Sequence, residues 1–163
     1  MPAEPRPALP VDSDIEVSDP AQRRELSATH GAVLAVIASG GALGAVARYG
    51  LTLKWPTPAD GFPWAIFTIN VTGSFLLAVL MVVITEIRPT HPLVRPFLGV
   101  GVLGGFTTFS TYANDTRALL DPATATLALG YLAGTLLAAL AATAVGLQLT
   151  RAAARLFTAQ VTL

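Results

Sequence analysis

The chain has 163 residues, of which 53% are hydrophobic and only 12% are charged, and its mean hydropathy is +0.61. A soluble domain carries about 25% charged residues. Nine of the charged residues fall within the first 25 positions, so that eleven remain for the other 138. A soluble fold could not cover its surface with so few charges. The composition therefore excludes a soluble globular enzyme and predicts an integral membrane protein.

The residue types that most enzyme chemistry needs are scarce. There is no cysteine, which excludes disulfides, thiolate metal sites and thiol catalysis. The two histidines, His30 and His91, lie outside the apolar runs, so an imidazole metal cluster or a serine triad has no material. No acid lies within an apolar run, and no phosphate-binding loop is present. We therefore predict that the protein is not an enzyme, and its net charge of zero gives no reason to expect a nucleic-acid partner.

The sequence divides into three regions. Residues 1–29 are rich in Pro, Asp, Glu, Ser and Arg and lack the apolar segment of a signal peptide, which predicts a disordered polar N-terminal tail on the cytoplasmic side. Residues 30–155 hold the apolar runs and form the predicted transmembrane domain. Residues 156–163 are predicted to be a short C-terminal tail.

Four apolar runs follow the N-terminal tail. About 20 helical residues span the 30 Å of hydrocarbon in a bilayer. The runs are Gly31–Leu53, Phe62–Thr85, Pro96–Asn114 and Pro122–Thr150. Short polar connectors, two of them punctuated by proline, separate these runs. The pattern predicts an all-α membrane protein with four transmembrane helices, which crosses the cell membrane several times.

The charges flanking the runs give only a small orientation bias. Six arginines would share one side of the membrane with both termini, and three basic residues would share the other. Such a bias is compatible with insertion in both orientations. A protomer of four helices can hardly enclose a polar pathway alone, so the chain is expected to be an accessory subunit or to build a pathway between protomers. Gly130 and Gly134 have the spacing of a close helix contact, although packing within one bundle explains them equally well.

The third run carries the most information. It holds four glycines within seven residues, followed by a stretch of hydroxyl side chains that ends at Tyr112. Because glycine costs about 1 kcal/mol per helix position relative to alanine, the Gly104-Gly105 pair favours a break in this helix. The carbonyl groups freed at a break are natural ligands for a small hard cation such as Na⁺. A continuous helix whose hydroxyls bond to backbone carbonyls is the alternative.

Neutral polar and aromatic side chains within the runs are the other candidates for function. Asn70 lies near the centre of the second run, where its amide could donate to an anion or join two helices. Phe109 and Tyr112 share a helix face and could turn electropositive ring edges toward an anion, or simply pack. Arg48 could reach the membrane interface or attract anions to a vestibule. With no acid or histidine in the runs to carry protons, these features suit passive movement of a small anion.

Three motifs together resemble the Fluc (CrcB) family of fluoride channels. They are Gly40-Gly-Ala-Leu-Gly-Ala-Val-Ala-Arg-Tyr49, Asn70-Val-Thr-Gly-Ser-Phe75 and Gly104-Gly-Phe-Thr-Thr-Phe-Ser-Thr-Tyr112. Tyr131 and Thr135 also look like the polar positions of the family's fourth helix, and the resemblance covers about Val33 to Leu149. It implies an antiparallel dimer of four-helix protomers, formed with itself or with a homologous chain. In such a dimer the third helix is broken in mid-membrane, and two fluoride pathways run between the subunits.

The resemblance also implies roles for individual residues. Asn70 would donate hydrogen bonds near the pathway, and the ring edges of Phe109 and Tyr112 would meet fluoride. The backbone carbonyls of Gly104 and Thr107 would surround one structural Na⁺ at the dimer interface. The remaining positions that resemble pathway residues are Ser110, Thr111, Tyr131, Thr135 and Arg48.

The chain departs from the family pattern at several positions. Tyr112 stands where phenylalanine is usual, so its hydroxyl could add a donor or narrow the path. Asp115 replaces a glutamate, and Ala139 replaces a hydroxyl residue one turn beyond Thr135. The predicted function is passive, fluoride-selective export of cytoplasmic fluoride, which lowers its toxicity. The alternatives are a non-conducting partner subunit of a heterodimeric channel and a small dual-topology exporter, although the latter normally needs a buried acid.

Overall fold

The computed structural model describes residues 31–161, with side chains as far as Leu156. The predicted N-terminal tail, residues 1–29, lies outside the described residues. The chain divides into two units, Met1–Ala32 and Val33–Leu163, and the helices from Val33 onward belong to the second.

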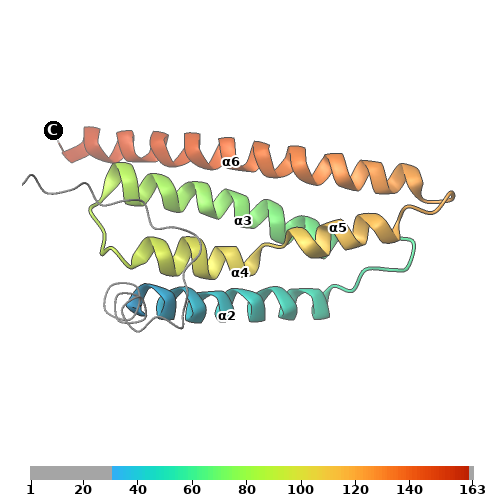
Figure 1. The fold of residues 1–163 in the computed structure, drawn as a ribbon. Coiled ribbons are helices and arrows are strands. Elements are labelled where there is room, and N and C mark those ends of the chain that lie inside the picture. The colour runs from blue at the N-terminus through green and yellow to red at the C-terminus, as the bar shows by residue number, and fades with distance from the viewer. Residues whose placement is uncertain (1–30, 162–163) are drawn as a thin grey trace, which may run out of the picture. The chain divides into compact units, whose positions relative to one another are not determined.

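Every regular element in the described part of the chain is a helix (Figure 1). In chain order they are α2 (Gly31–Lys54), α3 (Trp64–Val82), η2 (Val83–Ile87), η3 (Arg95–Leu103), α4 (Gly104–Phe106), α5 (Phe109–Ala118) and α6 (Ala125–Val161). The segments η2 and η3 are π-helical, which is a wider winding than that of an α-helix. The segment η2 continues α3, and η3 forms the first part of the third apolar run. The segment η2 ends before Arg88, whose backbone is extended because Pro89 follows it.

Among the described residues, three helices are long and apolar enough to cross a bilayer. They are Gly31–Lys54, Trp64–Ile87 and Ala125–Leu156. A chain in lipid must satisfy its backbone groups internally, which these uninterrupted helices do. The prediction of an all-α membrane protein is therefore confirmed at this level. The predicted third run forms a helical segment from Arg95 to Ala118 that is interrupted once, at Thr107 and Thr108.

Glycines hold α2 against η3 and α4 at a distance that no side chain would allow. A Cβ added to Gly40 would lie 2.5 Å from the carbonyl oxygen of Phe97, and one added to Gly44 would lie 2.7 Å from the amide nitrogen of Phe106. A Cβ on Gly105 would collide with the Gly41 carbonyl oxygen. Close backbone approach of this kind is what small residues provide between membrane helices.

This packing corrects the predicted position of the helix break. The sequence favoured a break at Gly104-Gly105, but both glycines are helical in α4, and the backbone becomes extended at Thr107 and Thr108. The physical reason is that Gly105 serves the contact with Gly41, whereas the two β-branched threonines adopt extended conformations readily. A break in the third run is confirmed, three residues later than expected.

The core lies between α3, α5 and α6. Its largest fully buried side chains include Tyr131, Ile69 and Val82. The helices α3 and α6 pack along their lengths, and Gly146 of α6 lies against the backbone of Phe75. The cluster that joins all three helices consists of Ile66, Ile69, Tyr112, Leu119, Ala128 and Tyr131. Tyr112 therefore belongs both to this core and to the segment that follows the break.

The last helix differs from expectation in two respects. It continues to Val161, so the helix enters the region predicted as a C-terminal tail, residues 156–163. A Cβ added to Gly130 or Gly134 would meet no heavy atom within 4 Å among the described residues outside its own helix. The interpretation of these two glycines as packing sites within one bundle is therefore wrong.

We predict that Gly44→Ala destabilises the protein by about 1–3 kcal/mol, because the added methyl group collides with backbone atoms of Val102 and Phe106. Gly50→Ala is the matched control in the same helix, since an added Cβ there meets nothing within 4 Å. It should be neutral or stabilise by up to about 1 kcal/mol. Thermal unfolding in detergent measures both. Equal melting temperatures for the two variants would contradict this packing.

Candidate functional site

A groove of about 330 Å³ opens between α3, the interrupted third segment and α6. Every side chain that lines it is neutral, and one amide and several hydroxyl groups lie among apolar side chains. The lining residues are Asn70, Gly73, Ser74, Leu77, Gly99, Leu103, Gly104, Thr107, Thr108, Phe109, Tyr112, Thr135, Leu136 and Ala139. The structure thus brings together six of the predicted site residues: Asn70, Gly104, Thr107, Phe109, Tyr112 and Thr135.

The amide of Asn70 holds the break open. Its Oδ1 accepts a hydrogen bond from the backbone N–H of Thr108 at 2.9 Å, and its Nδ2 donates to the Thr108 carbonyl at 3.0 Å. One side chain therefore replaces the two helical partners that an extended residue loses. Of the two readings left open by the sequence, joining helices is the one this geometry displays. The second N–H of the Asn70 amide is not used in either bond.

Thr108 caps the helix that follows the break. Its Oγ1 accepts a hydrogen bond from the N–H of Thr111 at 3.2 Å, as an N-cap residue does for the first turn of a helix. The same hydroxyl lies 3.0 Å from the Thr111 hydroxyl and 3.3 Å from that of Ser110. The hydroxyls of Ser110 and Thr111 are therefore gathered around the cap. Thr108 itself was missed by the sequence analysis, although threonine ahead of a helical stretch is an N-cap signal.

The carbonyl groups at the end of α4 lose their usual donors. In an uninterrupted helix, Gly104 would accept from the N–H of Thr108, and Thr107 would accept from that of Thr111. Here the first N–H binds Asn70 and the second binds the Thr108 hydroxyl. Two backbone carbonyls are thus released beside the groove, and carbonyl oxygens are ligands suited to a hard cation.

The two aromatic side chains of α5 have opposite environments. Phe109 is 79% exposed on the rim of the groove, whereas Tyr112 is 8% exposed and its ring lies 5.8 Å from that of Phe109. The Tyr112 hydroxyl donates a hydrogen bond to the backbone carbonyl of Leu132 on α6. It is therefore used to join α5 to α6, and only the ring of Tyr112 faces the groove.

Tyr131 and Thr135 lie one turn apart on α6 and are both buried. Within the described residues, neither the Tyr131 hydroxyl nor the Thr135 hydroxyl has a hydrogen-bond partner. The Asp115 carboxylate is the polar group that interacts with the Tyr131 hydroxyl electrostatically. Buried polar groups are rarely left unpaired. Thr135 lines the groove directly, and Tyr131 lies behind Tyr112 with ring centroids 5.2 Å apart.

Arg48 lies apart from this groove. Its Nε donates to the Gly105 carbonyl at 3.2 Å, which ties α2 to α4 just before the break. Arg48 and Thr111 line a second groove of about 400 Å³, together with Asp115. Ser110 and Tyr131 line neither groove. The predicted site residues thus line one neutral groove and one charged groove, except for Tyr131, which is buried in the core, and Ser110, which is exposed.

Comparisons with known proteins agree with the motifs. The family described as CrcB-like protein, Camphor Resistance (CrcB), matches residues 35–147. The chain is 59% identical over 114 residues to "Fluoride-specific ion channel FluC 1" of Streptomyces coelicolor, a match that covers 70% of this chain and 74% of the relative. It is 53% identical over 134 residues to "Fluoride-specific ion channel FluC 2" of Streptomyces avermitilis, covering 81% and 84%. A third relative, "Fluoride-specific ion channel FluC" of Rhodospirillum centenum, is 42% identical over 124 residues, covering 74% and 97%.

We predict that Tyr112→Phe lowers the free energy of unfolding by about 1 kcal/mol, because the bond to the Leu132 carbonyl is lost while the ring stays in place. Tyr49→Phe removes a hydroxyl from a tyrosine that is 64% exposed, and it should leave stability unchanged. Denaturant unfolding of the detergent-solubilised protein compares the two. If both variants unfold like the unmodified protein, the Tyr112 hydroxyl does not join the helices.

Proposed function

The chain belongs to the CrcB family, and we propose that it is a passive membrane channel specific for fluoride, which lowers the concentration of this ion in the cytoplasm. The observation that carries the proposal is the groove lined entirely by neutral groups, in which hydrogen-bond donors and an exposed aromatic ring lie together. Neutral donors can replace the water around a small anion without holding it as tightly as a fixed positive charge would. No step requires bond chemistry, in keeping with a channel and not an enzyme.

Export follows from the acid–base chemistry of fluoride. Hydrogen fluoride crosses a bilayer as a neutral molecule and dissociates inside the cell, where the ion is trapped. A passive path for the anion lets the membrane potential drive it out, because a negative interior repels it. The protein crosses the cell membrane several times, and its predicted fourth crossing would be the interrupted segment from Arg95 to Ala118.

The channel assembles as an antiparallel dimer, of this chain with itself or with a homologue. Two observations support this. The groove is open on one side of the protomer, and Phe109 on its rim is 79% exposed, which is costly for a pathway unless a second subunit covers it. A modest imbalance of basic residues at the two ends also permits insertion in both orientations.

Within the dimer, the remaining N–H of Asn70 and the ring edges of Phe109 and Tyr112 meet the dehydrated ion. The Thr135 hydroxyl, which lines the groove without a hydrogen-bond partner among the described residues, supplies a further donor on α6, and Tyr131 supports the path from behind Tyr112. The hydroxyls of Ser110 and Thr111 lie beside the fluoride path, because hydrogen bonds to the Thr108 hydroxyl hold them there. Arg48 attracts anions to the second groove, where its guanidinium has N–H groups beyond the one bound to Gly105.

A structural Na⁺ fits the break. The carbonyls of Gly104 and Thr107 have lost their helical donors, and no group of three or more His, Cys, Asp or Glu side chains among the described residues could hold a metal instead. A cation between two such breaks would link the carbonyl oxygens of the two protomers. The two carbonyl groups would hold the ion through their oxygens, since the bonds of Thr108 keep their usual donors away.

If Na⁺ fills this position, replacing it by N-methylglucamine should lower the melting temperature of the detergent-solubilised dimer by several degrees, because a ligand that binds only the folded state stabilises it. The melting temperature is measured by differential scanning fluorimetry at constant ionic strength. A melting temperature that is independent of Na⁺ would contradict the proposal.

The proposed channel function is tested by reconstituting this chain alone into liposomes and recording fluoride efflux with an electrode, with a potassium ionophore present. We expect fast fluoride efflux and little chloride flux. Phe109→Leu should slow fluoride efflux about tenfold, the factor that a loss of about 1.4 kcal/mol gives. Phe67→Leu is the control, because Phe67 packs against the core and does not line the groove.

Equal fluxes of chloride and fluoride would contradict the proposed selectivity. If the folded chain conducts no fluoride alone but does so with a homologous chain, the homodimer is excluded. If both preparations are silent, the channel function fails.

A further inference from the structure

A charged hollow lies where α3 passes into η2 beside α6, and it shares no residue with the neutral groove or the groove beside Arg48. Its volume is about 310 Å³, and it lies between the last turn of α3, the π-helical turn η2 and α6. The residues that line it are Val82, Glu86, Ile87, Arg151, Ala154 and Arg155. Two arginines and one glutamate give this hollow a net charge of +1.

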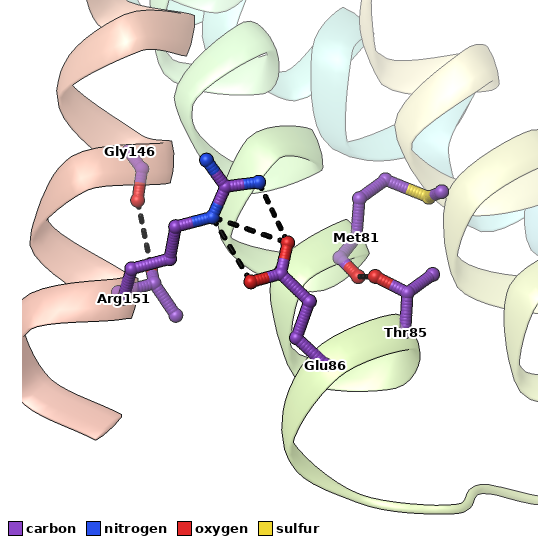
Figure 2. A network of polar contacts seen from close by, with 6 residues as sticks. Met81, Thr85, Glu86, Gly146 and Arg151 are labelled. Carbon is purple, nitrogen blue, oxygen red and sulfur yellow. Dashed lines mark hydrogen bonds and ion pairs between the residues drawn. The ribbon is translucent and has the colours of Figure 1, made fainter. Parts of the chain in front are cut away.

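The arginine nearest to η2 is held in place by an ion pair. Figure 2 shows Glu86 and Arg151 facing each other across the gap between η2 and α6. The Arg151 Nη2 donates to the carboxylate at 2.6 Å, and Nε donates to its two oxygens at 3.1 and 3.0 Å. These bonds leave the other terminal nitrogen, Nη1, outside the ion pair. The guanidinium is thus fixed in orientation while part of it stays available as a donor.

Arg155 lies one turn further along α6, and its positive charge attracts the same Glu86 carboxylate. Within the described residues it forms no ion pair at hydrogen-bonding distance. An arginine that is four residues from another on a helix points to the same side. The two guanidinium groups would repel each other unless an anion lay between them, and Glu86 neutralises only one of the two charges.

In a bilayer crossed by α3 and α6, the headgroup phosphates would lie at the level of this hollow. The candidate span Trp64–Ile87 ends here, and the charge-free stretch of α6 ends at Thr150, directly before Arg151. Two further exposed arginines, Arg88 and Arg95, flank the connector at this same end. Apolar surface adjoins the charges, since Ile87 is 41% exposed and Leu156 is 70% exposed. A ligand that fits both features has an anionic head and an apolar body.

We propose that this hollow binds the phosphate headgroup of an anionic phospholipid, with the phosphodiester between Arg151 and Arg155 and the acyl chains along the apolar surface. Basic pockets between transmembrane helices are suited to such headgroups. Glu86 acts as a positioning residue that holds Arg151 for the phosphate. Free phosphate shares the headgroup chemistry, but it would gain nothing from the exposed Ile87 and Leu156. This site is independent of the proposed channel function.

The test is native mass spectrometry of the full chain in detergent with equal amounts of phosphatidylglycerol and phosphatidylcholine. We expect the unmodified protein to retain phosphatidylglycerol preferentially. The double variant Arg151→Gln/Arg155→Gln should lose at least fivefold of this preference, about the factor that one basic residue contributes near a membrane surface. Arg117→Gln is the matched control, because it removes an exposed arginine from α5 and should retain the preference.

Two further arms complete the experiment. Inorganic phosphate is added at millimolar concentration, and it should not displace the bound phosphatidylglycerol. Displacement would overturn the assignment to a lipid. Retention of the preference by the double variant, its loss in Arg117→Gln, or its absence from the unmodified protein would overturn the site. Because both arginines are exposed, the variants are expected to fold, and unchanged binding of phosphatidylcholine confirms this.

Discussion

The pair of hydrogen bonds between the Asn70 side chain and the backbone of Thr108 is the interaction on which the rest of the site depends. In lipid, irregular backbone is tolerated only where protein or water satisfies it. An unpaired amide costs several kcal/mol there, and the Asn70 amide removes that cost for both polar groups of one residue at once. A carboxylate could accept from Thr108 but could not donate to it, and an apolar residue could do neither.

Several features of the site follow from this pair of hydrogen bonds, which we call the Asn70 clamp. Because Thr108 is extended, its hydroxyl caps α5, the carbonyls of Gly104 and Thr107 lose their donors, and Phe109 is placed on the rim of a neutral groove. The contact between α4 and α2 fixes the preceding half of the segment, and the Tyr112 hydroxyl fixes the following half to α6. The two halves are therefore held independently of each other. The backbone between them can be extended, because the Asn70 side chain satisfies its polar groups.

Much of this architecture could be predicted from the sequence, because a membrane imposes few choices. The apolar runs predicted all but one of the helix ends to within a few residues, and the exception is the end of α6. The three motifs identified the family. The break was predicted near Gly104, because helix propensity counts against glycine, yet the need for close contact between Gly105 and Gly41 keeps this stretch helical. The partner of the Tyr112 hydroxyl, the ion pair between Glu86 and Arg151 and the capping role of Thr108 depend on distances between segments, which spacing along one chain does not give.

Amide hydrogen exchange of the protein in lipid nanodiscs tests the clamp most directly. Asn70→Ala should speed exchange at Thr108 and Thr111 at least about tenfold, the factor that corresponds to about 1.4 kcal/mol of lost protection, and it should leave exchange in α2 unchanged. Asn114→Ala, which removes an exposed amide from α5, should alter neither. If Asn70→Ala leaves Thr108 as protected as in the unmodified protein, another interaction holds the break, and Asn70 is not the clamp of this site.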